Sequence, residues 1–338
     1  MNILYITKNV VEYKAAMYQN EFLQELHRQE NVVIYGPGEE LFDSCLDINQ
    51  VVSKLNFNPD WILVGHAWLS DKESGKLDEY PDLKLEKTMI PKAIMLNKEY
   101  VRLKDKLDWI KFNNFQSGFS HHHNVNYYSG TSNTPFHFLP FAFDEAKVAT
   151  IPSQEKVLSL SFSGILQNQN KSAKQSDIRL RVMNSIFITI FDIPLFKRNK
   201  YRHLSIFWNS IPRNRYTARL AKLIGKYKRM SDSDYYAMQK KSIIFFNSPS
   251  PLEIISPRVF ENMACKAIPF CQKSNVILEG CHIVTYKDDL SDFDEKLEYC
   301  LSGKKEINDM IEKNYENAFK NHTWNARVKS LTKILKNN

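Results

Sequence analysis

Residues 242–270 read SIIFFNSPSPLEIISPRVFENMACKAIPF, and this stretch decides the predicted fold. Its first six residues, 242–247, form a short apolar run typical of a buried strand. A proline-containing loop follows. Ser256 and Pro257 then predict a helix start, because serine caps helix N-termini and proline fits the first helical turn. Strand, loop and helix in this order are the repeating unit of a parallel α/β protein.

The N-terminal part of the chain repeats this alternation of apolar runs and helical spacing. Residues 13–28 carry apolar side chains at roughly helical spacing between the first two runs, which gives a β-α-β start. A helix ending near residue 107 and an extended segment at 109–112 are predicted further along. The runs interpreted as strands lie at 1–8, 32–35, 61–66 and 90–96.

A second series of elements begins after residue 150. Residues 157–164 give a new strand signal, and a polar loop and a basic helix follow. The Lys/Arg-rich segment 194–230 has no clear period, so no structure is predicted for it. Two helices are predicted over 304–336, with a break at 321–324.

The length of the chain favours two domains. At 338 residues it exceeds what one hydrophobic core usually serves, and 43% hydrophobic with 25% charged residues is an ordinary globular composition. We expect an α/β protein with two Rossmann-like domains, 1–150 and 151–320, whose parallel sheets face each other across a cleft. A terminal helix, 321–338, is expected to pack back toward the first domain.

Composition also bounds location and chemistry. The apolar runs fall short of the roughly 18 to 20 residues of a membrane span, and the first eight residues lack the basic start of a signal peptide. Five cysteines without a Cys-x-x-Cys pair favour reduced thiols. We therefore expect a cytoplasmic protein without zinc or redox chemistry.

The charge of the chain favours an anionic partner. Its formal net charge is +8 at pH 7. A phosphate-bearing substrate, an anionic membrane surface and a nucleic acid would each satisfy this charge. Charge alone does not choose among them.

The helix that starts at Ser256 is a candidate anion site. Its first turn offers unpaired N–H groups and a partial positive charge, and Arg258 adds a fork of donors that suits a diphosphate. Glu253 lies in the loop before the helix and Glu261 about one turn inside it. Carboxylates at these two positions suit the vicinal hydroxyls of a sugar and a ribose.

This stretch resembles the donor site of the glycosyl transferases group 1. The resemblance is carried by the Glu253-x7-Glu261 spacing, by the helix of small residues and by Ala-Ile-Pro at 267–269. The family has the GT-B fold of two Rossmann-like domains and includes the spore-maturation-protein-like bacterial enzymes. Residues 321–327, NHTWNAR, are similar to the family's C-terminal helix signature. Weaker likeness lies at 139–144 and 162–164.

The resemblance implies an enzyme that transfers a sugar from a nucleotide-sugar donor to a glycan, lipid-linked or protein acceptor. It implies retention at the anomeric carbon, with donors on the phosphates in place of a metal ion and with no cofactor. It implies no nucleic-acid partner. A cytoplasmic location with peripheral contact to an anionic membrane is consistent with the basic charge.

The resemblance also implies roles for single residues. Glu253 would be the catalytic contact to the transferred sugar, and Glu261 the contact to the ribose. Arg258, beside Ser256 at the helix start, would bind the diphosphate.

A second phosphate contact is implied after the strand that ends at Gly164, from Lys171 or Lys174. Two features depart from the family pattern. The family usually places a glycine near Lys266, and a Gly-rich phosphate loop in the first domain is absent from this sequence.

Histidines add a further candidate and a competing interpretation. His66 follows an N-terminal strand, at the sheet edge where ligands bind, and is a candidate polar group near the acceptor. The alternative is a strand-end histidine with a structural role. His121, His122 and His123 suggest a metal, but neighbouring side chains of an extended segment point to opposite faces, which disfavours one shared ion.

A second class of function remains open at this stage. A basic, non-catalytic protein could bind nucleic acid or act as a partner subunit, and it would need its arginines on one exposed face. The segment 197–229, with interleaved aromatic residues, would then be a nucleic-acid or membrane surface, or a solvated basic face. The residues concerned are Arg213, Arg215, Arg219 and Lys222.

Overall fold

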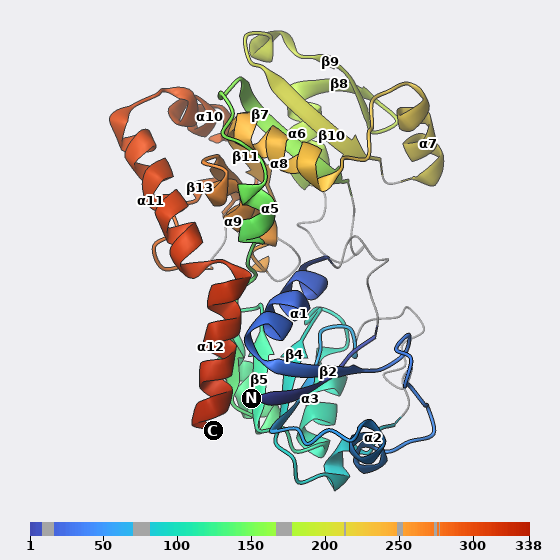
Figure 1. Cartoon of the computed structure of the whole chain (residues 1–338). Coiled ribbons are helices and arrows are strands. Elements are labelled where there is room, and N and C mark those ends of the chain that lie inside the picture. Colours follow the sequence, from blue (N-terminus) through green and yellow to red (C-terminus); the bar gives the residue numbers. More distant parts are fainter. Residues whose placement is uncertain are drawn as a thin grey trace. The chain divides into compact units, whose positions relative to one another are not determined.

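Two units, each built on a parallel sheet, make up the chain in the computed structural model (Figure 1). The first unit comprises Met1–Ala142 and Trp324–Asn338, and the second comprises Phe143–Thr323. The sequence placed the corresponding boundaries at 150 and 320. The structure describes residues 1–8, 17–69, 82–166, 178–212, 214–248, 253–273, 276 and 278–338.

The sheet of the first unit has six strands in the order β2-β1-β3-β4-β5-β6, and all neighbouring pairs are parallel. Its strands are β1 (Asn2–Ile6), β2 (Asn31–Tyr35), β3 (Trp61–Val64), β4 (Lys92–Leu96), β5 (Ser117–Ser120) and β6 (Phe136–Phe138). Its helices are α1 (Met17–Gln29), α2 (Ile48–Leu55), η2 (Leu85–Lys87), α3 (Leu103–Phe112), α4 (Val125–Ser132) and α12 (Trp324–Asn337).

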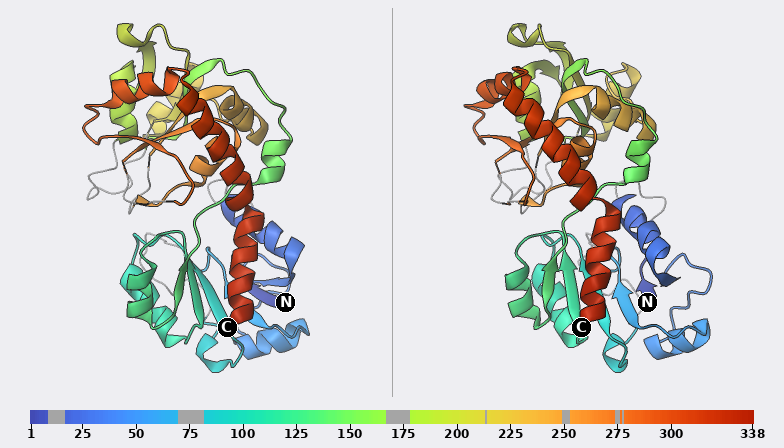
Figure 2. Two further views of the ribbon diagram at one scale, coloured as in Figure 1. Left: turned by 90° about the vertical axis from the view of Figure 1, so that its left-hand side faces the viewer. Right: turned by 60° about the vertical axis from the view of Figure 1, so that its left-hand side comes forward.

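Both faces of this sheet are buried, which explains why its strands read as continuous apolar runs. Leu4 and Ile6 point to the face covered by α2, α3 and α4. Ile3 and Tyr5 point to the opposite face, where α1 and α12 pack. The C-terminal helix lies along α1 in both further views (Figure 2).

Specific contacts attach α12 to the first unit. The Nε1–H of Trp324 donates to Glu21 Oε2 at 3.0 Å, and Arg327 Nε donates to the carbonyl oxygen of Pro140 at 2.8 Å. The Trp324 ring also packs against Phe22. The tail residues 321–327 therefore end the second unit and begin a helix of the first.

The sheet of the second unit has five parallel strands in the order β10-β7-β11-β12-β13, and an antiparallel hairpin, β8–β9, stands beside it. The strands are β7 (Leu158–Ile165), β8 (Phe187–Ile190), β9 (Ile193–Lys197), β10 (Ile206–Ile211), β11 (Ser242–Asn247), β12 (Ile268–Gln272) and β13 (Val284–Tyr286). The helices are α5 (Glu145–Ala149), α6 (Ile178–Ile186), η3 (Asn199–Tyr201), α7 (Arg215–Leu223), α8 (Asp232–Lys241), α9 (Pro257–Ala264), α10 (Phe293–Leu301) and α11 (Lys305–Asn321).

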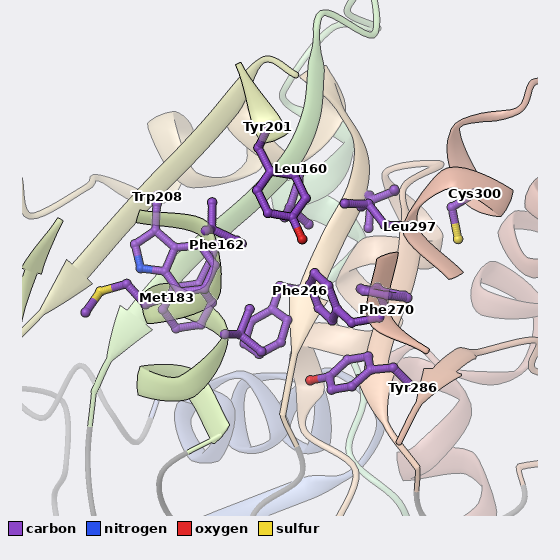
Figure 3. Close-up of a cluster of buried hydrophobic side chains, with 14 of the residues drawn as sticks. Leu160, Phe162, Met183, Tyr201, Trp208, Phe246, Phe270, Tyr286, Leu297 and Cys300 are labelled. Atoms are coloured by element: carbon purple, nitrogen blue, oxygen red, sulfur yellow. The ribbon is translucent and has the colours of Figure 1, made fainter. Parts of the chain in front are cut away.

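An aromatic core covers one face of this sheet. The tilted rings of Phe162, Trp208 and Phe246, on neighbouring strands, pack against one another, and the cluster continues to Phe270 and Tyr286 (Figure 3). Helices α6 and α10 close over this face, and α8 covers part of the other face. Among the described residues, no helix has the length and apolarity needed to cross a membrane.

Most predicted elements are confirmed, and one is wrong. The predicted strand 242–247 is β11 residue for residue, and the break at 321–324 separates α11 from α12. The segment 109–112, predicted as extended, is instead the last turn of α3, and the next strand begins only at Ser117. The prediction failed because a short apolar run is typical of both a strand and a buried helix segment. In α3 the buried residues Leu107 and Ile110 lie on one face of the helix.

Helix α9 ends in a left-handed residue that is not glycine. Lys266 has φ +52°, and the N–H groups of Lys266 and Ala267 donate to Met263 and Asn262, which is a Schellman motif. The glycosyl transferases group 1, which this stretch of sequence resembles, usually have a glycine near this position. The Lys266 ammonium contacts both carboxylate oxygens of Glu312, at 2.6 and 2.8 Å.

Substituting Lys266 by glycine and by alanine separates the stability cost of the left-handed backbone from the contribution of the lysine side chain. Both variants lose the contact to Glu312, so their difference reports the left-handed backbone alone. We expect Lys266→Gly to be more stable than Lys266→Ala by about 1 kcal/mol, measured by urea unfolding. At Lys313, exposed within α11, the same pair should show the reverse order by about 1 kcal/mol. Equal stability of the two Lys266 variants would contradict the argument.

Candidate functional site

The carboxyl edge of the second sheet gathers the segments that the sequence singled out. Strands β7 and β11 end at Ile165 and Asn247, and α6 and α9 begin after them. In a parallel sheet, helices that follow neighbouring strands turn their N-termini toward this edge. Ser256 has the extended backbone of an N-cap and Pro257 occupies the first turn, as predicted, but the Ser256 side chain makes no capping hydrogen bond to that turn.

Two guanidinium groups flank one aromatic ring at this edge. The Cζ atoms of Arg179 and Arg258 each lie 5.9 Å from the centroid of Phe162. Arg179 is held by hydrogen bonds from Nε to Ser248 Oγ at 2.6 Å and from Nη1 to the carbonyl oxygen of Ile165 at 2.7 Å. The two cations come from the first turns of two different helices.

Gly164 lies under this pair. A Cβ atom at Gly164 would stand 3.1 Å from the Phe162 ring and 3.5 Å from Arg258 Nη2. The absence of a side chain therefore lets the Phe162 ring approach the strand closely, whereas 3.5 Å would be an ordinary contact for the guanidinium. Gly164 belongs to the packing of this arginine pair.

The electrostatics of the pair favour an anion. Burial, followed by repulsion from Arg258, lowers the pKa of Arg179 to about 10. Two like charges in a partly buried place repel each other, and an anion bound to both would relieve this repulsion. Phosphate oxygens match the planar fork of a guanidinium well.

Glu261 and Arg258 are joined through a tyrosine. Tyr235 Oη donates to Glu261 Oε2 at 2.9 Å and accepts from Arg258 Nε at 3.3 Å. Burial, with the Glu261 charge as second cause, raises the pKa of Tyr235 well above its usual value, so its hydroxyl stays protonated. Gln239 Nε2 also lies 3.4 Å from the same carboxylate oxygen. This network fixes the orientation of Glu261.

Glu253 stands in a strained backbone conformation. Its φ is +60°, in the left-handed region that side chains other than glycine seldom adopt. Such residues persist where the surroundings hold them, and they concentrate at functional sites. Glu253 is partly buried, and it precedes the first turn of α9.

A cavity of about 170 Å³ adjoins the start of α9. Ser248, which accepts the hydrogen bond from Arg179, lies in its wall together with Ser256. Val259 and Cys271 give it apolar surface, and Gln272 gives it a polar end. The arginine pair and this cavity therefore share one rim of the second unit.

The sequence missed two residues of this arrangement and named two that the structure does not describe. Arg179 and Tyr235 were not selected, although Arg179 is the first basic residue of the helix that follows the Gly164 strand. Lys171 and Lys174, predicted as the second phosphate contact, lie outside the described residues. Within the described part of the chain, Arg179 follows the Gly164 strand and lies beside the same ring as Arg258.

In the first unit, His66 meets one of the three consecutive histidines. His66 follows β3 by two residues and is 1% exposed, and His121 directly follows β5. Their Nε2 atoms lie 2.9 Å apart, and the two rings stack. His122 points elsewhere, with its Nδ1 2.6 Å from the hydroxyl of Tyr128.

The hydrogen bonds fix the tautomers of this histidine pair. His121 Nδ1 lies 2.7 Å from the carbonyl oxygen of Leu139, which can only accept, so Nδ1 carries the proton. In the neutral ring His121 Nε2 then accepts, and His66 Nε2 must donate to it. His66 Nδ1 is therefore an unprotonated acceptor, and it is buried with no hydrogen-bond partner among the residues that the structure describes. Among the described residues, no group of three or more His, Cys, Asp or Glu side chains could hold a metal ion.

Acid should destabilise the first unit through this pair. Burial lowers the pKa of His121 to about 4 and that of His66 well below its usual value. At pH values between these lowered pKa values and about 6.5, the pKa of histidine in the unfolded chain, the unfolded chain binds protons that the folded chain does not. The free energy of unfolding is therefore highest above pH 7 and falls as the pH is lowered. For His121 alone we expect a loss of about 2 kcal/mol between pH 7.5 and pH 5.

Urea unfolding followed by tryptophan fluorescence measures this effect, because Trp61, Trp68, Trp109 and Trp324 all lie in the first unit. His121→Asn should remove about 2 kcal/mol of the pH dependence. The matched variant His123→Asn, at an exposed neighbour, should leave it intact. The same pH dependence in both variants would show that the buried pair does not cause it.

Comparison with solved structures finds this two-sheet architecture in other proteins. A glycosyltransferase from Rickettsia africae matches with a TM-score of 0.60 at 11% identity, over 99% of this chain and 98% of that one. HepE from Anabaena, in complex with UDP and glucose, matches at 0.61 and 9% identity over 100% of both chains. Sucrose-phosphate synthase from Thermosynechococcus elongatus matches at 0.59 and 12% identity, over 100% of this chain and 98% of that one.

The architecture and these matches show the GT-B fold. Residues 194–333, which are less than half of the chain, match the family model described as Glycosyl transferase-like. No curated protein sequence matches the chain. The predicted fold class and the predicted enzyme class are thereby confirmed.

Proposed function

We propose that this glycosyltransferase takes its sugar from a nucleoside diphosphate sugar bound at the carboxyl edge of the second sheet. The observation that carries the proposal is the convergence of Arg179 and Arg258 on Phe162, at the start of α6 and α9. Two forked cations beside two helix N-termini suit the two phosphates of such a donor. The HepE structures, which contain UDP or UDP-glucose, make uridine nucleotides the first to test.

The two glutamates would bind the two sugars of the donor, the ribose and the transferred sugar. Glu261, oriented by Tyr235, would accept hydrogen bonds from the ribose hydroxyls, since a carboxylate has about four acceptor sites. Glu253, in its strained position before α9, would contact the transferred sugar. Ser256 would offer its backbone N–H at the start of the helix.

In the proposed reaction the bond between the anomeric carbon and the diphosphate breaks, and a bond to an acceptor hydroxyl oxygen forms. The nucleoside diphosphate leaves with the electron pair, and it takes up the proton that the acceptor hydroxyl loses. Arg179 and Arg258 would stabilise the charge on the departing diphosphate without a metal ion. Retention at the anomeric carbon is part of the proposal, supported by the Glu253-x7-Glu261 pattern.

The acceptor would be a glycan, a lipid-linked sugar or a protein. His66 is the proposed contact to its hydroxyl, because the partner His121 leaves His66 Nδ1 as an unprotonated acceptor. The low pKa of His66 keeps this nitrogen unprotonated at neutral pH. Its buried, unpartnered state supports a role in binding a polar group.

Loss of an arginine should weaken nucleotide binding. Calorimetry of UDP, GDP, ADP and CMP should find micromolar binding of one of them to the wild type, and EDTA should not abolish it. Arg179→Lys should bind that nucleotide about 10-fold more weakly or worse, because lysine keeps the charge but lacks the fork. Lys305→Ala, on the exposed start of α11, is the control and should bind normally. Normal affinity of Arg179→Lys and Arg179→Ala would exclude the site.

The two glutamates should differ in what they recognise. Glu253→Gln should weaken binding of the nucleotide sugar about 10-fold or more and change binding of the free nucleoside diphosphate by less than about twofold. Glu261→Gln should weaken both ligands, since the ribose is common to them. Calorimetric titration with each ligand gives the comparison. Equal effects of Glu253→Gln on both ligands would refute its assignment to the sugar.

A further inference from the structure

The hairpin β8–β9 and helix α7 of the second unit carry large apolar side chains that do not face a core. Phe191 and Phe196 of the hairpin region are 69% and 68% exposed. Leu223, at the end of α7, is 83% exposed. Figure 1 shows α7 and the hairpin on the β10 side of the sheet. Other exposed apolar residues of these elements are Ile188, Ile190, Tyr216, Leu220 and Ile224.

Helix α7 is amphipathic, but its apolar side faces solvent. Tyr216, Leu220 and Leu223 follow each other at helical spacing and line one face, and all are exposed. The only buried residue of the helix is Ala221. A surface helix of a globular protein normally turns its apolar face inward. Here the apolar stripe points away from the protein.

A contact joins the two elements. Lys226, just after α7, reaches the carbonyl oxygen of Leu195 in β9 with its ammonium group at 3.4 Å. The segment after α7 is held to the edge strand β10 by two hydrogen bonds between Asn209 and the backbone of Lys228. Hairpin and helix therefore belong to one region of the unit, here called the hairpin–helix face: residues 187–197 and 214–226.

The chain from residue 193 onward through this face is basic, and Asp192 in the hairpin turn is the acidic residue of the face. Between residues 193 and 231 the sequence contains no aspartate or glutamate. Lys200 and Lys228 have acidic partners from outside this segment, in Asp294 and Asp234. The basic residues are Lys197, Arg198, Lys200, Arg202, Arg213, Arg215, Arg219, Lys222, Lys226, Lys228 and Arg229.

We propose that the hairpin–helix face docks on the surface of an anionic lipid bilayer. Side chains such as Phe191 and Leu223 would enter the boundary between headgroups and acyl chains, and Arg219 and Lys222 would contact lipid phosphates. Exposed apolar groups interleaved with cations are the pattern of an interfacial helix. A nucleic acid would use the cations and the aromatic rings, but it would leave aliphatic side chains such as Leu220 and Leu223 without a function. The proposal goes beyond the donor site and does not depend on it.

Vesicle sedimentation tests the proposal with the full-length protein. The wild type should sediment with vesicles of phosphatidylcholine and phosphatidylglycerol and stay in solution with phosphatidylcholine alone. Each basic residue near an anionic surface contributes about fivefold in affinity, so Arg219→Gln with Lys222→Gln should lower binding about 10-fold or more. Failure of the wild type to bind the anionic vesicles would overturn the proposal.

Apolar variants distinguish a membrane from a purely electrostatic partner. Phe191→Gln with Leu223→Gln leaves the charge unchanged and should also lower vesicle binding about 10-fold or more. Met89→Gln, at a 97% exposed methionine of the first unit, is the matched control and should bind as the wild type. Unchanged vesicle binding of the apolar double variant would overturn the proposal. Tighter, salt-sensitive binding to duplex DNA or RNA that the apolar variant retains would assign the face to nucleic acid instead.

Discussion

Within each of the two large sheets the strands are parallel, and the placement of the arginine pair and of the histidine pair depends on this. In a parallel sheet the carboxyl ends of the strands meet at one edge, and the helices that follow present their N-termini there. This brings Arg179 and Arg258, distant in the sequence, to the same ring in the second unit. In the first unit it brings His66, after β3, to His121, after β5.

Neutral groups hold both arginines in position. Ser248 and a backbone carbonyl orient Arg179, and the protonated hydroxyl of Tyr235 orients Arg258 while it also binds Glu261. The groups that hold these guanidiniums directly are neutral, and the Glu261 carboxylate is linked to Arg258 through the Tyr235 hydroxyl. Such preorganised cations, placed before a ligand arrives, reduce the reorganisation that binding an anion requires.

Residues with a left-handed backbone lie on both sides of α9. Glu253 precedes the helix and Lys266 follows it, although glycine would adopt either conformation with less strain. Lys266 carries side-chain contacts that glycine lacks, to Glu312 and to the ring of Tyr315 on α11. The proposed role of Glu253 requires its carboxylate. At both positions the function of the side chain explains why a residue other than glycine adopts a left-handed backbone, which costs about 1 kcal/mol in stability.

Local sequence determined the elements and the donor pattern, because strand periodicity, capping and the Glu253-x7-Glu261 spacing each act over a few residues. It misjudged 109–112, where a short apolar run hid the helical face of α3. Only the tertiary structure selected Arg179, since its role depends on which strand ends become neighbours. Only the tertiary structure revealed that α7 turns its apolar side outward, because an amphipathic pattern is the same whether that side meets a core or solvent.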